Sequence, residues 1–317
     1  MKKFVLPLLL VIELVFFVRL PASGVRFGSW PEFIETFGYY LADVVPQAAP
    51  LLILSLGMTM VLMTAGIDLS AGSMVALIAC VMSSFAAGPT FWVTAVPAGL
   101  VLALLLGSFN GLLIARLDVP PIIATLGTLF FYRGFCEVVM RGLEKGPFAD
   151  VPGYLWFGGF TGTLVITGLL LVVGGSYFYR SRWRRELLML GGNRVAARYA
   201  DIPVHRRIVQ VYTLMGLLAF VAALCATSHD GSVIASWRTG LELQVIVAVV
   251  LGGTRVDGGN GSIVGSVVGV FLIAVLDEGL RGAEMSELKP ILLGVLLVAG
   301  VWLNTKVGTG ARAVGMA

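Results

Sequence analysis

A single run of seventy residues constrains this chain more than any other feature. From Pro46 to Ala115 the sequence is almost entirely apolar, and Asp68 is its only charged residue. A helix needs about 20 mostly apolar residues to cross a bilayer. The run therefore has room for three membrane spans and predicts an integral membrane protein.

The composition supports the same conclusion. Hydrophobic residues make up 58% of the 317 residues and charged residues 13%, against roughly 45–50% and about 25% in soluble proteins. A soluble chain of this length has too little interior to bury so much apolar surface. Soluble enzymes and nucleic-acid-binding proteins are excluded.

Apolar segments divide the chain into ten candidate spans, and the short segment 241–253 cannot cross a bilayer alone. The segments are 4–18, 46–65, 71–88, 91–115, 119–140, 161–179, 208–228, 241–253, 262–280 and 290–304. The first also resembles a secretory signal peptide, but Glu13 and the nine later spans favour a retained helix. We expect an all-α polytopic membrane protein with about ten transmembrane helices, some of them broken, in a single domain over residues 1–317.

The distribution of basic residues predicts the orientation. The loop 180–207 carries eight arginines and only two acidic residues. Basic loops remain in the cytoplasm. Six spans precede this loop and four follow it, so the model of ten spans also places both termini, with Lys2, Lys3 and Lys306, in the cytoplasm.

Two glycine-rich segments interrupt apolar runs and resemble each other. Residues 65–73 and 252–262 each contain Asp-x-x-x-Gly-Ser, beginning at Asp68 and at Asp257, and each leads into an apolar helix. Backbone groups freed by such a break cannot face lipid, so they face protein or a water-filled path. Alternatively, Asp or Ser caps the helix that follows. Both interpretations stay open. The similarity of the two segments predicts a pseudo-repeat within the chain.

Polar groups are few in the other spans. Asn110 lies between Gly107 and Gly111, while Arg133 and Glu137 lie four residues apart on one helix face. Such groups usually face the bundle interior or a cavity. Asn110 can instead form an interhelical hydrogen bond, and Arg133 and Glu137 can form a structural ion pair. The glycine pair 107 and 111 and the row 261, 265 and 269 predict close helix packing.

The basic loop contains a short predicted helix. Asn193 can cap it, Arg194–Ala200 gives about two turns, and Pro203 closes it. A helix this short is marginal in water, so it needs a partner surface. Anionic lipid headgroups or a protein could provide that surface.

Four stretches, taken together, resemble the permease subunits of bacterial ABC importers for ribose, xylose, galactose and rhamnose, in the branched-chain amino acid/monosaccharide permease family. Residues 65–73 resemble the family's GGIDLSVGS, and 124–128 with Arg133-Gly134 resemble its ATLGT…RG. Residues 191–198 are similar to its GGNPEAAR segment, and 252–262 to its GGTSLSGGRGS. The resemblance extends over about residues 45–305.

The resemblance implies a permease subunit that moves a monosaccharide (a pentose, a hexose or a deoxyhexose such as rhamnose) across the bacterial inner membrane. It implies three partners: a cytoplasmic ABC ATPase, a periplasmic or extracellular sugar-binding protein, and a second permease chain, identical or not. ATP and Mg²⁺ are then bound by the ATPase, and this chain holds no cofactor and is not an enzyme. The candidate residues for coupling to the ATPase are Gly192, Asn193, Ala196, Ala197, Arg198 and Asp201.

The candidate residues for the substrate pathway are Asp68, Ser70, Asn110, Thr125, Arg133 and Glu137. The coupling segment departs from the family pattern, since Arg194-Val195 replaces Pro-Glu and Asp201 replaces a usual glycine. Asp257 also replaces a neutral residue. These departures suggest a dedicated ATPase partner or a divergent member of a heteromeric pair.

Two other functions compete with this one. A proton-coupled secondary sugar transporter would use Asp68 or Glu137 as its proton carrier and would need no ATPase. An intramembrane enzyme would need a catalytic motif, and the sequence contains no HExxH or GxSxG. The three cysteines show no CxxC spacing and the two histidines are far apart, so no metal site is expected.

Overall fold

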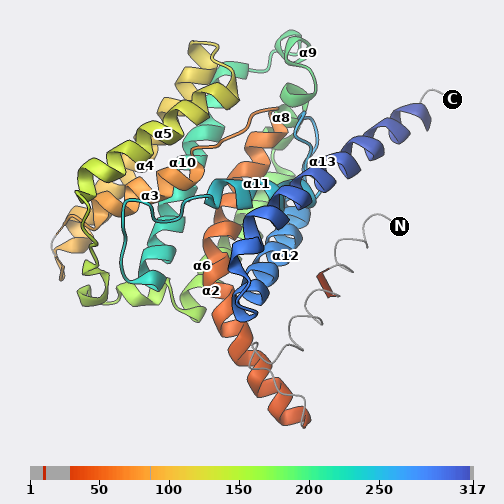
Figure 1. Ribbon diagram of the computed structural model, residues 1–317. Coiled ribbons are helices and arrows are strands. Elements are labelled where there is room, and N and C mark those ends of the chain that lie inside the picture. The colour runs from red at the N-terminus through yellow and green to blue at the C-terminus, as the bar shows by residue number, and fades with distance from the viewer. Residues whose placement is uncertain (1–9, 12–28, 86, 315–317) are drawn as a thin grey trace.

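The computed structural model describes residues 10–11, 29–85 and 87–314, with side chains up to Trp302, as a bundle of helices (Figure 1). Within these ranges there is no strand, and one isolated bridge joins Lys145 to Val233. Most of the predicted first span, 4–18, lies outside the described residues.

Six helical stretches in the described ranges are long and apolar enough to cross a membrane. They are α2 (Trp30–Met63), α4 (Phe91–Arg116), α5 (Pro121–Met140), Phe160–Arg180, α10 (Val204–Asp230) and α12 (Ile263–Gly282). The stretch Phe160–Arg180 consists of α6 (Phe160–Leu169), the π-helical turn η4 (Leu170–Gly174) and α7 (Gly175–Arg180). A further helix, α13 (Lys289–Val314), includes the residues of the last predicted span, 290–304. The predicted all-α polytopic fold is confirmed.

Helix α2 is the centre of the bundle. It packs against α10, α12, α11 and α6, and the apolar part of it is largely buried. The predicted start at residue 46 was wrong, because the helix begins at Trp30, where Ser29 accepts a hydrogen bond from the Glu32 amide at 3.4 Å. Aromatic rings stack along its first turns, from Trp30 to Tyr40. This side-chain pattern supports a helix where hydropathy alone indicated a loop.

Two apolar helices of the described chain are too short to cross a membrane alone. Helix α3 (Ala71–Met82) has 12 residues and α11 (Leu241–Leu251) has 11, or about 18 and 16 Å at 1.5 Å per residue. The expected short span at 241–253 is confirmed. The expected full span at 71–88 was wrong, because the helix ends at Met82 and turns follow through residue 85. Both short helices are broken spans enclosed by protein, which is where free backbone groups are tolerated.

Glycines bring α4 and α10 into close contact. A Cβ carbon at Gly107 would lie 2.4 Å from the carbonyl oxygen of Tyr212, and one at Gly216 would lie 2.2 Å from that of Ala103. Gly265 and Gly269 likewise lie against the backbone of Gly252 and Ala248. The predicted packing role of the spaced glycines is confirmed for these positions.

The basic loop forms two helices at one end of the bundle. They are α8 (Arg182–Gly192) and α9 (Arg194–Tyr199), at the end opposite the start of α2 (Figure 1). Short 3₁₀ turns at Pro147–Asp150, Tyr154–Phe157 and Ser286–Leu288 complete the helical elements of the described chain.

Candidate functional site

The break between α2 and α3 is buried and organised by Asp68. The Oδ1 atom of Asp68 accepts hydrogen bonds from the amide of Ser70 at 2.9 Å and from its hydroxyl at 2.6 Å. Both residues are fully buried. Asp68 therefore fixes the shape of the break itself, while Ser70, the residue ahead of α3, makes no side-chain cap.

Residues from α4 and α5 extend this arrangement into one network. The Asn110 amide donates to the hydroxyl oxygen of Ser70 at 2.7 Å, and the Tyr132 hydroxyl lies 3.3 Å from Asn110 Oδ1. The Thr125 hydroxyl lies 3.0 Å from the carbonyl oxygen of Ile67. We call this group the polar core; it consists of Asp68, Ser70, Asn110, Thr125 and Tyr132. Four of the six predicted pathway residues are thus brought together.

Glu242 lies beside the polar core and was missed by sequence analysis. It stands at the first turn of α11 with only 7% of its surface exposed. A Cβ carbon at Gly72 would lie 2.0 Å from Glu242 Oε2, so the carboxylate rests on the first turn of α3. A lone acid in the short apolar segment 241–253 was the available signal, since charges at membrane depth are usually functional.

Two carboxylate oxygens in this region lack partners. Within the described chain, Asp68 Oδ2 and Glu242 Oε2 are buried and make no hydrogen bond. Burying a charged oxygen without a partner is costly. Each of these two oxygens can therefore accept a hydrogen bond that no group of the described chain donates.

Arg133 and Glu137 do not form the ion pair that their spacing allowed. Instead, the Arg133 guanidinium donates Nη1 hydrogen bonds to the carbonyl oxygens of Ala235 at 3.0 Å and Trp237 at 2.9 Å. Glu137 is exposed. The alternative of a structural ion pair was wrong, because the carbonyls of the loop between α10 and α11 take up the Arg133 donors.

The short helix predicted in the basic loop is present as α9. Asn193 Oδ1 accepts from the amides of Val195 at 2.9 Å and Ala196 at 3.0 Å, which makes Asn193 the expected N-cap. Ala197 is buried, whereas Gly192, Ala196 and Arg198 are exposed. The large apolar side chains exposed on this helix are Val195 and Tyr199, the latter 90% exposed.

Asp201 ends this segment in a left-handed conformation. Its φ is +57°, a region in which glycine is favoured and Asp and Asn are tolerated. This geometry explains why the family pattern has glycine at this position. The substitution by Asp therefore keeps the turn.

Three segments meet at the base of α9. The amide of Gly259 donates to the carbonyl oxygen of Met63 at 3.1 Å, and Gly191 packs on the same carbonyl group. Gly258 lies against Ala65 and the carbonyl oxygen of Gly191. We call these contacts the glycine junction; it joins the end of α2, the end of α8 and the turn 252–262. The two segments that echo each other in sequence therefore touch in space.

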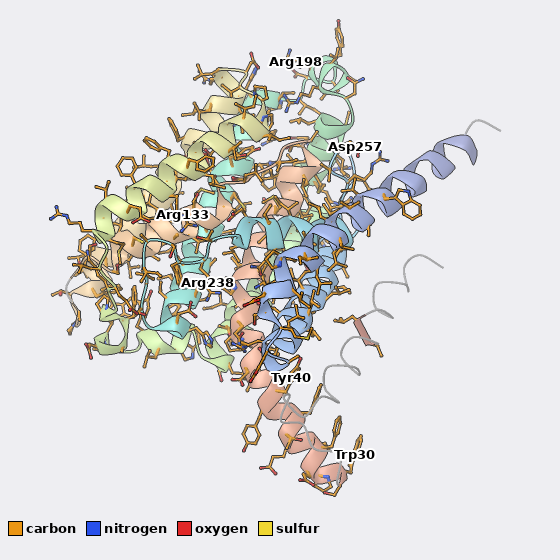
Figure 2. All side chains as sticks on the ribbon, in the orientation of Figure 1. Trp30, Tyr40, Arg133, Arg198, Arg238 and Asp257 are labelled. Carbon is orange, nitrogen blue, oxygen red and sulfur yellow. The ribbon has the colours of Figure 1, made fainter. Side chains whose placement is uncertain are left out.

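The second Asp-x-x-x-Gly-Ser segment differs from the first in its bonding. Asp257 pairs with Arg255, with an Arg255 Nε to Asp257 Oδ1 distance of 2.8 Å, and this pair raises the pKa of Arg255 above its ordinary value. Ser262 rather than Asp257 caps α12, accepting from the Gly265 amide at 3.1 Å. Figure 2 shows Asp257 and Arg198 toward the same end of the bundle, opposite Trp30.

Comparison with known proteins identifies the family. Residues 40–301 match the model for "Branched-chain amino acid transport system / permease component". The chain is 32% identical over 274 residues to the ribose import permease protein RbsC of Escherichia coli (strain K12), covering 84% of this chain and 85% of that protein. It is 32% identical over 282 residues to RbsC of Bacillus subtilis (strain 168), covering 87% of each.

A second group of relatives carries a different name. The chain is 34% identical over 266 residues to the autoinducer 2 import system permease protein LsrD of Klebsiella pneumoniae, covering 78% of each. No solved structure matches the chain. The chain belongs to the branched-chain amino acid transport system / permease component family. It is the non-catalytic permease subunit of an ABC importer, a type that carries no cofactor and works with a partner ATPase, which binds ATP, and with a substrate-binding protein.

Proposed function

We propose that this subunit carries a monosaccharide or a similarly small polar solute across the bacterial inner membrane, driven by an ABC ATPase. The names of its relatives support this substrate class, since both RbsC and LsrD are import permeases, for ribose and for autoinducer 2. Within that class we propose a pentose, hexose or deoxyhexose. Family membership speaks against the proton-coupled alternative.

The observation that carries this proposal is the glycine junction. An ATPase docked on α9 would move α8 and α9 as it closes. Gly191 transfers such a movement to the carbonyl group of Met63 without an intervening side chain. Met63 is the last residue of α2, five residues before Asp68. The contact therefore supports a short mechanical path from the coupling segment to the polar core.

We propose the polar core as part of the substrate path. Asp68, Ser70, Asn110 and Thr125 are buried in this structure, so the path is closed there. Arg133, Glu137 and Glu242 extend it. The free oxygens of Asp68 and Glu242 can accept hydrogen bonds from sugar hydroxyl groups when the first turns of α3 and α11 separate.

We further propose that α8 and α9 face the cytoplasm and that both termini lie on that side. The eight arginines of 180–207 support this orientation. The ATPase would bind α9, and a binding protein would approach the opposite end, where α2 begins. A second permease chain, identical or related, completes the channel, and residues 1–317 act as one permease domain.

Transport in proteoliposomes tests this function. The complex of this chain with its ATPase is reconstituted with ATP on the α9 side, and uptake of radiolabelled ribose, xylose, galactose and rhamnose is measured with the binding protein present. We expect ATP-dependent uptake of one of these sugars that a protonophore leaves unchanged. Uptake that follows a proton gradient without ATP would contradict the proposal and assign Asp68 or Glu137 a proton-carrier role.

A further inference from the structure

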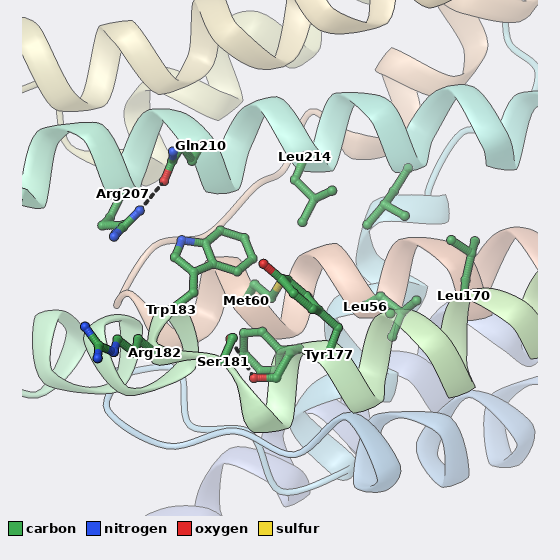
Figure 3. A pocket seen from close by; sticks show the side chains of 13 residues that line it. Leu56, Met60, Leu170, Tyr177, Ser181, Arg182, Trp183, Arg207, Gln210 and Leu214 are labelled. Atoms are coloured by element: carbon green, nitrogen blue, oxygen red, sulfur yellow. Dashed lines mark hydrogen bonds between the residues drawn. The ribbon is translucent and has the colours of Figure 1, made fainter.

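A groove of about 650 Å³ opens between α10 and the segment that runs from η4 through α7 to the start of α8 (Figure 3). Leu56 and Met60 of α2 contribute to its lining. The groove is separate from the polar core, since none of the polar-core residues lines it. Because it opens at the outer surface of a membrane-embedded bundle, lipid can reach it.

The lining changes character along the groove. Along α10, the lining residues Arg207, Gln210, Leu214 and Leu218 follow each other at spacings of three and four, on one helix face. Leu218 lies eleven positions after Arg207, or about 16 Å along the helix. Figure 3 shows Arg182, Arg207 and Gln210 at one end and Leu56 and Leu170 at the other. The groove is thus basic at the α8 end and apolar beyond it.

The basic end of the groove lies at the first turns of α8 and α10. Arg207 and Gln210 belong to the first two turns of α10, and Arg182 and Trp183 to the first turn of α8. Arginine and tryptophan at the end of a spanning helix are typical of the membrane interface. Basic pockets between transmembrane helices on the cytoplasmic side suit anionic lipid headgroups.

A free donor also points to an anionic ligand. In the described chain the indole Nε1 of Trp183 is buried and has no hydrogen-bond partner. Figure 3 shows the indole nitrogen turned toward Arg207. Arg207 is itself held by Glu186 and by Gln210, whose Oε1 accepts from Nη1 at 2.8 Å. Burying a donor without a partner is costly, and an acceptor oxygen of a ligand would offset that cost.

The apolar end is shaped by the π-helical turn. Leu170 and Gly174, the two ends of η4, both line the groove. Single π turns inside α-helices are frequent at functional sites. Gly174 adds no side chain, and a Cβ carbon there would meet no atom within 4 Å. The wall therefore leaves room for a linear apolar chain.

We propose that this groove binds one anionic phospholipid of the cytoplasmic leaflet. Its phosphate lies against Arg182 and the Trp183 indole N–H, and one acyl chain lies along Leu214, Leu218 and Leu56. This inference does not depend on the identity of the transported solute.

Native mass spectrometry of the detergent-purified full chain tests the proposal. The probes are phosphatidylglycerol and phosphatidylcholine with identical acyl chains. A second hollow, between α4 and α10, is also basic and is lined by Arg116, Arg198 and Arg206. Lipid binding alone therefore does not show which site is occupied, and variants of the groove are needed. Arg182→Gln should weaken phosphatidylglycerol binding about fivefold, since one arginine near anionic lipid contributes about 1 kcal/mol. Trp183→Phe, which keeps an aromatic ring, should also weaken it.

Two further variants complete the design. Arg185→Gln changes an exposed arginine of the same helix outside the groove and should leave the affinity unchanged. Gly174→Leu should fill the apolar end and reduce the binding of both lipids. Equal effects of Arg182→Gln and Arg185→Gln would overturn the proposal. Lipid binding that appears only after a dimer dissociates would overturn it as well, by assigning the groove to a second copy.

Discussion

Gly191 packs directly on the carbonyl oxygen of Met63, so closely that a Cβ carbon at Gly191 would stand 1.8 Å from that oxygen. The two residues are far apart in sequence, one at the end of α8 and the other at the end of α2. The contact joins the base of the proposed coupling helix to the central helix of the bundle. The turn 252–262 joins the same contact, because the Gly259 amide donates a hydrogen bond to the Met63 carbonyl oxygen.

Replacing Gly191 by alanine should therefore separate α8 from α2. A methyl group at 1.8 Å from an oxygen forces the backbone to move, and overpacking of this kind typically costs about 1–3 kcal/mol. We expect a lower melting temperature in detergent and a loss of ATP-driven uptake. Gly294→Ala in α13 is the control, because a Cβ carbon there meets nothing within 4 Å. Equal effects of the two variants would argue against the junction.

Asn110→Ala should destabilise the bundle by about 1 kcal/mol. The variant removes the donor to Ser70 and the acceptor near Tyr132, and the Ser70 hydroxyl loses a partner inside the protein. Thermal unfolding in detergent measures the change. Ser108→Ala on the same helix removes a half-buried hydroxyl that contacts Thr213 at 3.1 Å and should have a smaller effect. An unchanged melting temperature for Asn110→Ala would show that the network adds no stability.

Glu242→Gln should raise stability and lower transport. The neutral amide avoids burying a charge with a free oxygen, while a carboxylate that binds sugar hydroxyl groups is lost. This opposition between stability and activity is common at functional sites. Melting temperature and uptake are measured together, with the exposed Glu287 replaced by glutamine as the control. Full uptake by Glu242→Gln would show that the Glu242 carboxylate is not part of the substrate path.

Gly72→Ala should reproduce part of the Glu242 defect by a different route. A Cβ carbon at Gly72 would stand 2.0 Å from Glu242 Oε2 and would displace the carboxylate. We expect reduced uptake for Gly72→Ala, and the double variant Gly72→Ala/Glu242→Ala should take up as much solute as Glu242→Ala alone. Additive losses in the double variant would mean that the two residues act independently.

The sequence predicted most of the helices, but it did not predict the contacts between them. Apolar runs predicted the order of the spans because bilayer thickness sets their length. The start of α2 at Trp30 was missed because aromatic stacking, not hydropathy, supports its first turns. Arg133 was assigned Glu137 as a possible partner because spacing shows only neighbours on one helix. Its acceptors, Ala235 and Trp237, lie about a hundred residues further along the chain.

The candidate site shows the same division. The Asp-x-x-x-Gly-Ser echo marked both breaks, yet only the fold brings Met63 and Ala65 against Gly258 and Gly259. Asp68 stood out as a lone charge in a long run. Glu242, also a lone charge, was overlooked because its segment is short, and its contact with Gly72 cannot be read from spacing.

Capture of the ATPase tests the central claim most directly. The tagged protein is purified from detergent-solubilised native membranes, and its companions are identified by mass spectrometry. We expect an ABC ATPase to accompany the native chain and to be lost from Tyr199→Asp, which puts a charge on the exposed face of α9. Tyr39→Asp, at an exposed tyrosine near the start of α2, should retain the ATPase. Recovery of the ATPase with Tyr199→Asp, or its absence from the native chain under conditions that preserve such complexes, would contradict the coupling role of α9.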